Sequence, residues 1–124
     1  MDIILNRGGV YYCKEVRLLV SKNRKETLRN KYVLVLQGGH FFKRVNKVNV
    51  VLGTSKRIDK KYSTDVIIES CDSDLPKDTK FNCSEIYLFR KEDIIKSKYI
   101  CTLSPQKMRE IDIALILGLC IGLD

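Results

Sequence analysis

Metal ligands, paired cysteines and long apolar stretches are scarce in this sequence. It has one histidine, His40, and none of its five cysteines forms a C-x-x-C pair with another. We therefore expect no metal site and interpret the cysteines as free thiols, as is typical of a reducing compartment. The longest apolar tract, Ile111 to Leu123, contains Asp112 and is too short for a membrane-spanning helix, which needs roughly 20 residues. Nothing in the sequence points to a membrane protein.

Signals for secretion and for nucleotide hydrolysis are also missing. Only three apolar residues, Ile3 to Leu5, precede Asn6 and Arg7, and this is no secretory signal peptide. No strand-like run is followed by a glycine-rich phosphate loop with its lysine. We therefore expect a cytoplasmic protein that needs no cofactor and that does not hydrolyse nucleoside triphosphates with a P-loop.

The positive charge is concentrated in one part of the chain. Residues 14–61 contain fourteen Lys and Arg against three Asp and Glu, whereas residues 62–124 contain eight against eleven. An electric field of this kind attracts polyanions and speeds their capture. RNA or DNA is therefore the leading class of partner, and a solvated charged surface is the alternative.

Length and composition predict one domain over residues 1–124. The chain is long enough to bury a core, and 44% of its residues are hydrophobic. Aliphatic, β-branched and aromatic runs predict strands over Val10–Val20, Lys31–Gln37, Lys47–Leu52, Asp65–Glu69, Glu85–Phe89 and Tyr99–Leu103. The first strand is expected to bend near Lys14 to Arg17. The polar segments Ser21–Asn30 and Cys71–Lys80 are predicted to be loops.

A single helix is predicted near the end of the sequence. Ser104 is a good N-cap, and Pro105 suits the first helical position because the amide that it lacks would be unpaired there. Spacings of three and four residues turn one apolar stripe toward the core, formed by Met108, Ile111, Leu115 and Leu119. The last turns, Ile116 to Leu123, are apolar on nearly all sides and need a cover, either the protein's own barrel or a partner subunit. The whole pattern predicts an α+β domain, mainly β, built as a small, partly open β-barrel with a C-terminal helix.

One segment has the composition of a phosphate site. A predicted strand ends in Gly53 to Arg57 (GTSKR), which offers two hydroxyls followed by two cations. Hydroxyls donate hydrogen bonds to a phosphate, and cations neutralise the charge that develops on it. Because Arg29 and Lys31 stand at the mouth of the neighbouring predicted strand, this segment is a candidate site for phosphodiester chemistry.

The order and spacing of several segments resemble the MazF/PemK toxins of bacterial toxin–antitoxin systems. The similar segments cover most of the chain: Arg7–Tyr12 (RGGVYY), Lys31–Gln37 (KYVLVLQ), Val50–Ser55 (VVLGTS), Glu85–Asp93 (EIYLFRKED) and Leu103–Leu119. The last is the most specific, because it is similar to the family's closing helix, L-S-x-x-x-M-x-x-I-D-x-A-L-x-x-x-L. Leu88 departs from the pattern, since it stands where the family has glutamine.

The resemblance implies an SH3-like barrel with a C-terminal helix that works as a dimer and cuts single-stranded RNA without a metal. In that family a threonine and an arginine are catalytic, and the 2′-hydroxyl of the RNA attacks the adjacent phosphorus. Thr54 matches the threonine. The position of the arginine holds Lys31, followed by Tyr32 where the family usually has proline, and Arg29 could supply the guanidinium instead. Lysine can stabilise the charge of a phosphorane, but it is not bidentate as arginine is.

The sequence therefore predicts a metal-independent, sequence-selective endoribonuclease toxin with Thr54, Lys31 and Arg29 as catalytic residues. The side chains predicted to bind RNA are Ser55, Lys56, Arg57, Lys22, Arg24, Lys25, Lys43, Arg44 and His40. The expected partners are single-stranded RNA, a second copy of the chain and an acidic antitoxin segment that folds on binding. Two alternatives stay open: a nucleic-acid-binding relative that does not cut, and a toxin of the same fold that poisons DNA gyrase.

Overall fold

A computed structural model describes residues 3–20, 25–60, 62–70 and 73–122 of the chain. Its strands are β1 (Gly9–Val20), β2 (Lys25–Val35), β3 (Lys47–Thr54), β4 (Asp65–Ile68), β5 (Thr79–Asn82), β6 (Tyr87–Arg90) and β7 (Lys98–Thr102). Its helices are the short 3-10 helix η1 (His40–Phe42), α1 (Lys91–Ile95) and α2 (Pro105–Gly118). No helix in the described ranges is long and apolar enough to span a membrane.

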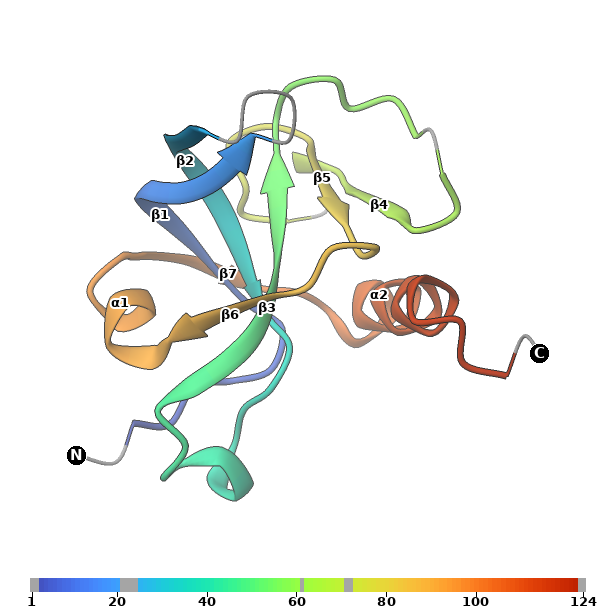
Figure 1. The fold of residues 1–124 in the computed structure, drawn as a ribbon. Coiled ribbons are helices and arrows are strands. Elements are labelled where there is room, and N and C mark those ends of the chain that lie inside the picture. The colour runs from blue at the N-terminus through green and yellow to red at the C-terminus, as the bar shows by residue number, and fades with distance from the viewer. Residues whose placement is uncertain (1–2, 21–24, 61, 71–72, 123–124) are drawn as a thin grey trace.

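The strands form one strongly curved antiparallel sheet (Figure 1). Its order is β4-β5-β3-β2-β1-β7, so β4 and β7 are the two end strands and the sheet is not closed. β6 lies off this path and pairs with the first half of β3, from Lys47 to Val50, whereas β5 pairs with Gly53 and Thr54 at its end. The same edge of β3 thus pairs with β6 in its first half and with β5 at its end. β5 and β6 diverge from each other between these two paired regions. The predicted α+β fold, mainly β with a partly open barrel and a terminal helix, is confirmed.

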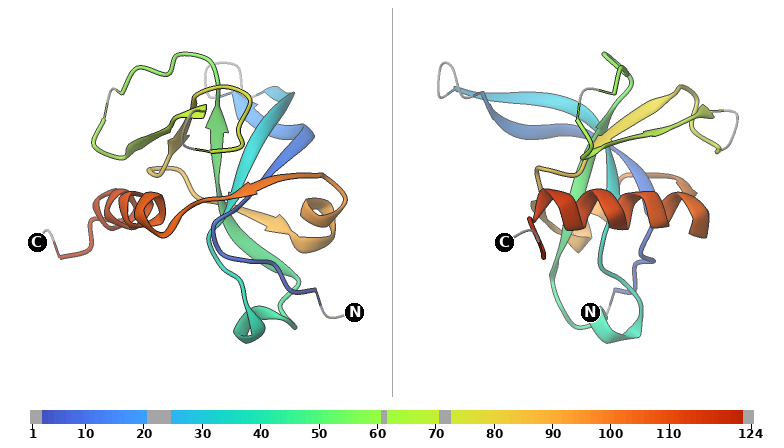
Figure 2. Two further views of the ribbon diagram at one scale, coloured as in Figure 1. Left: turned by 180° about the vertical axis from the view of Figure 1, so that it is seen from behind. Right: turned by 90° about the vertical axis from the view of Figure 1, so that its right-hand side faces the viewer.

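A β-bulge bends the first strand where the sequence predicts a bend. The pairing of β1 with β2 shifts register between Cys13 and Val16, and Glu15 has a positive φ of 57°. The amide of Glu15 donates to the side-chain oxygen of Asn30 at 3.1 Å, which ties the extra residue to the opposite strand. A bulge increases the local twist and bends the strand. The β1–β2 hairpin therefore turns away from the body of the sheet (Figure 2).

Two loop predictions are wrong in part. β2 begins at Lys25, so residues 25–30 of the predicted Ser21–Asn30 loop are strand, while residues 21–24 lie outside the described ranges. These polar residues are extended because they pair with β1 across the hairpin, as in the pair of Val16 with Arg29. β5 begins inside the second predicted loop, at Thr79. It is too short to show a clear period, because only Thr79 and Phe81 point into the core.

The helix α2 covers one face of the sheet (Figures 1 and 2). As predicted, Ser104 caps it, with its hydroxyl oxygen accepting a hydrogen bond from the amide of Lys107 at 3.2 Å. The helix buries Met108, Ile111 and Ala114 against a cluster that includes Val10, Leu34, Val51 and Phe81. The predicted stripe is wrong at Leu119, which lies past the end of the helix and is 56% exposed. Arg7 also joins this layer, because its guanidinium pairs with Asp112 on α2 and donates to the carbonyl of Leu36 at 2.9 Å.

A second cluster fills the other face of the sheet. It contains Leu5, Cys13, Val16, Val33, Val35, Val48, Val50 and Ile94. α1, which the sequence did not predict, contributes Ile94 and the buried Lys91. The ammonium group of Lys91 donates hydrogen bonds to the backbone carbonyls of Ile3, at 2.8 Å, and of Phe42. Lys91 therefore ties the N-terminal segment and η1 to the sheet while its own charge remains hydrogen-bonded.

Candidate active site

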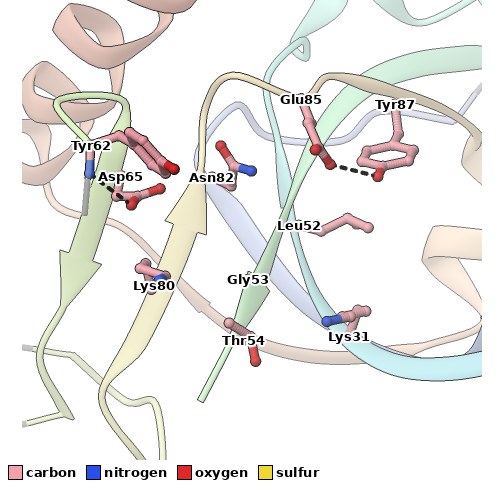
Figure 3. Close-up of a pocket in the computed structure, with 10 residues that line it drawn as sticks. All are labelled: Lys31, Leu52, Gly53, Thr54, Tyr62, Asp65, Lys80, Asn82, Glu85 and Tyr87. Atoms are coloured by element: carbon pink, nitrogen blue, oxygen red, sulfur yellow. Dashed lines mark hydrogen bonds between the residues drawn. The ribbon is translucent and has the colours of Figure 1, made fainter. Parts of the chain in front are cut away.

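A pocket lies where β5 and β6 diverge from β3 (Figure 3). We call it the fork pocket; it is open to solvent and has a volume of about 280 Å³. Its lining residues come from β2 to β6 and their connections: Lys31, Leu52, Gly53, Thr54, Tyr62, Asp65, Lys80, Asn82, Glu85 and Tyr87. Lys31 and Thr54, which the sequence predicts to be catalytic, thus line the same pocket.

The strand register brings Lys31 and Thr54 together. Tyr32 of β2 pairs with Gly53 of β3, and the same register continued by one residue sets Lys31 opposite Thr54. Directly opposite residues of an antiparallel pair point to the same face of the sheet, with Cβ atoms about 4.5–5.5 Å apart. An amine and a hydroxyl on neighbouring strands therefore face the same small volume.

A second cation flanks Thr54 from the other side. Lys80 of β5 pairs with Thr54, so its side chain leaves the same face of the sheet. Its ammonium group donates to the carbonyl of Asp59 at 3.2 Å, which ties the loop after β3 to the sheet. Asn82, two residues further along β5, pairs with the buried Asp65 of β4 and completes this wall. Thr54 therefore lies between two amines.

The environment of Lys31 shifts its protonation equilibrium toward the neutral form. Burial lowers the pKa of this amine below its ordinary value of 10.5, and the nearby positive charges of Arg29 and Lys56 lower it further. Desolvation and like charges both penalise the protonated amine. A larger share of Lys31 is thus deprotonated at a given pH than for a lysine in water, which suits a proton acceptor.

The hydroxyl of Thr54 is oriented by the backbone. Its oxygen accepts a hydrogen bond from the amide of Lys56 at 3.1 Å. With that amide on the oxygen, the hydroxyl hydrogen can be donated to another acceptor, such as a phosphate oxygen. The turn after β3 thus orients the hydroxyl of Thr54 so that it can donate a hydrogen bond to a ligand.

Gly53 is required by the packing behind Thr54. A Cβ atom at this position would lie 2.7 Å from Cε1 of Phe81 and 2.8 Å from Cγ2 of Thr79, both of which are fully buried in β5. Contacts below 3.0 Å force the neighbouring atoms to move. Glycine therefore lets β3 lie close to β5, and this closeness fixes the position of Thr54.

The other end of the fork pocket is acidic and aromatic. The hydroxyl of Tyr87 donates to Oε2 of Glu85 at 3.0 Å. Burial raises the pKa of Tyr87 above its ordinary value of 10.0, and the hydrogen bond to Glu85 and the negative charge of that carboxylate raise it further. Figure 3 shows Leu52 between this pair and the Lys31–Thr54 end.

The structure brings together some of the predicted RNA-binding residues and separates others. Ser55, Lys56 and Arg57 directly follow Thr54 in the chain. By contrast, η1 and the residues after it lie at the opposite end of β3, about 24 Å away for a strand of eight residues. This distant group consists of His40, Lys43 and Arg44.

The predicted residues of the β1–β2 hairpin are only partly described. Arg29 lies on β2, two residues before Lys31 and hence on the same face, but it does not line the fork pocket. Lys22 and Arg24 lie outside the described residues. Lys25 begins β2, and only its backbone is described.

Sequence reasoning missed most of the residues that line the fork pocket. Lys80 and Asn82 stood in or beside a predicted loop, and Glu85 and Tyr87 were assigned only to a strand. For Lys80 and Asn82, the sequence signal that could have predicted a strand was their position on either side of the apolar Phe81, which is buried. This alternation of polar and apolar residues does not indicate which strands are neighbours in the sheet.

The fork pocket has the groups that phosphodiester transfer needs. It offers a hydroxyl donor, an amine with a lowered pKa and a second amine, that of Lys80, at one end. Among the described residues, no three His, Cys, Asp or Glu side chains lie close enough together to hold a metal ion.

Comparisons with known proteins agree with this fold. A mycobacterial endoribonuclease is 21% identical, with a TM-score of 0.72 over 98% of this chain and 96% of that one. A MazF structure from Deinococcus radiodurans is 12% identical, with a TM-score of 0.73 over 97% of this chain and 100% of that one. A mycobacterial endoribonuclease solved with its cognate antitoxin is 22% identical, with a TM-score of 0.71 over 95% of this chain and 97% of that one.

The sequence itself also matches a family. Comparison with curated protein sequences gave no match. Residues 6–119, nearly the whole chain, match the family described as "PemK-like, MazF-like toxin of type II toxin-antitoxin system". This range includes the fork pocket, the sheet and α2. The chain belongs to the PemK-like, MazF-like family of toxins.

Proposed function

We propose that this protein is an endoribonuclease toxin that cuts single-stranded RNA at selected sequences without a metal ion, and that it acts in the cytoplasm. The observation that carries this proposal is that Lys31 and Thr54, each next to the paired residues Tyr32 and Gly53 of neighbouring strands, line one pocket. Similar solved structures are named endoribonucleases, which supports the same activity.

The proposed reaction uses the groups at this end of the fork pocket. The neutral amine of Lys31 accepts the proton of the RNA 2′-hydroxyl, and the 2′-oxygen forms a bond to the adjacent phosphorus. Thr54 donates a hydrogen bond to a non-bridging phosphate oxygen, while nearby cations neutralise its charge. The bond from phosphorus to the 5′-oxygen breaks, and this oxygen takes a proton from solvent. The products are a 2′,3′-cyclic phosphate and a free 5′-hydroxyl.

Incubation of the protein with a long single-stranded RNA in the presence of EDTA tests this proposal. We expect cleavage at discrete positions, with 5′-hydroxyl ends that polynucleotide kinase can label directly. A matched oligonucleotide with one 2′-deoxy nucleotide at a cleavage position should resist cutting there, since it lacks the nucleophile. Binding of RNA without cleavage would support the alternative of a non-catalytic relative, and loss of cleavage in EDTA would refute metal independence.

We also propose that the protein is a homodimer. Apolar side chains on and after the end of α2 are exposed, including Ile113, Ile116, Leu119 and Ile121. Such a group of exposed apolar residues is typical of a surface that another subunit covers. We expect light scattering at micromolar concentration to give twice the 14.3 kDa mass of one chain. A particle of 14.3 kDa would contradict the dimer.

An acidic antitoxin segment is the third proposed partner. Related structures carry a cognate antitoxin or a MazE protein in their names. The positive charge of residues 14–61 would attract an acidic, initially disordered segment as it attracts RNA. Such a segment would compete with RNA for the cations around Thr54.

A further inference from the structure

The acidic end of the fork pocket has no role in the phosphate chemistry. Glu85 carries a negative charge, which repels a phosphate, and it lies opposite Lys31 and Thr54 across Leu52 (Figure 3). A phosphate at the basic end therefore leaves the Glu85–Tyr87 end for a part of the RNA that is not anionic. The nucleobases are that part.

The shape of this end suits a base. Tyr87 pairs with Val50 across the β3–β6 edge, and Leu52 lies two residues further along the same face of β3. The ring of Tyr87 and the side chain of Leu52, both only partly buried, give the pocket an apolar lining. Unpaired RNA bases stack on aromatic rings of this kind, with a gain of about 1–3 kcal/mol per base.

The carboxylate of Glu85, beside the ring of Tyr87, can only accept hydrogen bonds. Tyr87 donates to Oε2 of Glu85, and this direction is fixed because the raised pKa of Tyr87 keeps its hydroxyl protonated. Within residues 3–20, 25–60, 62–70 and 73–122, Glu85 receives no second hydrogen bond from a side chain or an amide. An ionised carboxylate has about four acceptor positions, so three remain for a ligand.

We infer that the fork pocket recognises the base next to the cleaved phosphate, with Tyr87 stacking on that base and Glu85 accepting hydrogen bonds from its Watson–Crick edge. This inference rests on the proposed function, since it assigns part of the same pocket to substrate selection. Guanine fits best, because its N1–H and its N2 amino group are adjacent donors that match the two oxygens of a carboxylate. Uracil fits worst, because its single N3–H lies between two carbonyl oxygens that repel the carboxylate. Adenine and cytosine each offer one amino group and lie between.

The test uses a set of RNA oligonucleotides that differ at the two nucleotides flanking one cleavage position. Cleavage rates are measured for guanine, inosine, adenine, cytosine and uracil at each position. At one of the two we expect guanine to be cut at least about tenfold faster than uracil, the discrimination of a good bidentate contact. Inosine, which keeps N1–H but lacks the amino group, should be cut at an intermediate rate.

Variants separate base recognition from stability and from chemistry. Glu85→Gln replaces one acceptor by a donor, so the ratio of guanine to uracil cleavage should fall toward one while RNA is still cut. Tyr87→Phe keeps the ring but no longer orients Glu85, so the ratio should fall only in part. Glu110→Gln on α2, which does not line the fork pocket, is the matched control and should keep the ratio.

The outcomes distinguish failure of the inference from failure of the proposed function. If no oligonucleotide is cut, the proposed function fails, and the inference is then judged by binding of 2′-deoxy oligonucleotides with guanine or uracil at the same positions. If RNA is cut with no preference for guanine over uracil at either position, the inference is wrong. It is also wrong if the preference is unchanged in Glu85→Gln.

Discussion

Replacement of Thr54 by valine is expected to lower the rate of RNA cleavage by about two to three orders of magnitude, the cost of removing one preorganised donor to a developing negative charge. Valine keeps the branched shape and the strand preference of threonine, so the change removes the hydroxyl that Lys56 orients and little else. The rate is measured on a short oligonucleotide that contains one cleavage position. A Thr54→Val protein with full activity would show that the catalytic site lies elsewhere.

Lys31→Met should cause a loss of the same size, since a positioned base contributes about 10²–10⁴ in rate. Arg29→Ala should cost less, because Arg29 acts on Lys31 through its charge and does not line the fork pocket. Lys47→Met, at the far end of β3, is the matched control and should retain activity. If Arg29→Ala is the more damaging change, the roles of these two residues are reversed.

The pH profile decides which form of Lys31 is used. A proton acceptor must be neutral, so the rate should rise from pH 6 to 9 as a growing share of the amine loses its proton. The midpoint is expected below 10.5, because burial, Arg29 and Lys56 all lower the pKa of Lys31. A rate that falls over this range would mean that the ammonium form stabilises the phosphate instead.

Replacement of Gly53 by alanine is expected to destabilise the protein by about 1–3 kcal/mol, the usual cost of overpacking a core. The added methyl would lie 2.7–2.9 Å from atoms of Phe81 and Thr79. β3 must then move away from β5, which displaces Thr54 from the position that its strand register gives it. Chemical denaturation measures the stability, and cleavage by the still folded fraction measures the displacement.

A double-mutant cycle shows whether the contact with Phe81 is the cause. Phe81→Leu alone should be destabilising, because it leaves space in the core. Together with Gly53→Ala it should cost less than the sum of the two single changes, since the smaller side chain makes room for the new methyl. Additive costs would place the effect of Gly53→Ala outside this contact.

Much of the fold could be predicted from the sequence because its signals are local. Glycines bound the buried strands, and Ser104 with Pro105 marks the start of α2. The bend in β1 could be predicted because the charged residues Lys14, Glu15 and Arg17 interrupt its apolar run. β5 and α1 were missed because each has five residues or fewer and takes its structure from neighbours: β5 by pairing with Gly53 and Thr54, α1 by burying Ile94.

The candidate site was predicted only on its basic side. Thr54 and Lys31 were found from composition and from a family resemblance, and the register shows why they belong together. Glu85 and Tyr87 were not found, because β6 pairs with the first half of β3 while β5 pairs with its last two residues. This change of pairing partner along β3 creates the fork pocket. The residue pattern of a single strand does not predict which strands pair with it.

The ion pair between Arg7 and Asp112 joins residues 105 positions apart in the chain. A ribosome makes Arg7 first and Asp112 only after every strand has been synthesised. Until α2 emerges, Leu34, Val51 and Phe81 have no helix to cover them, although Lys31 and Thr54 already exist. Because α2 follows every described strand in the chain, this face of the sheet stays uncovered until the helix has been synthesised and has left the ribosome.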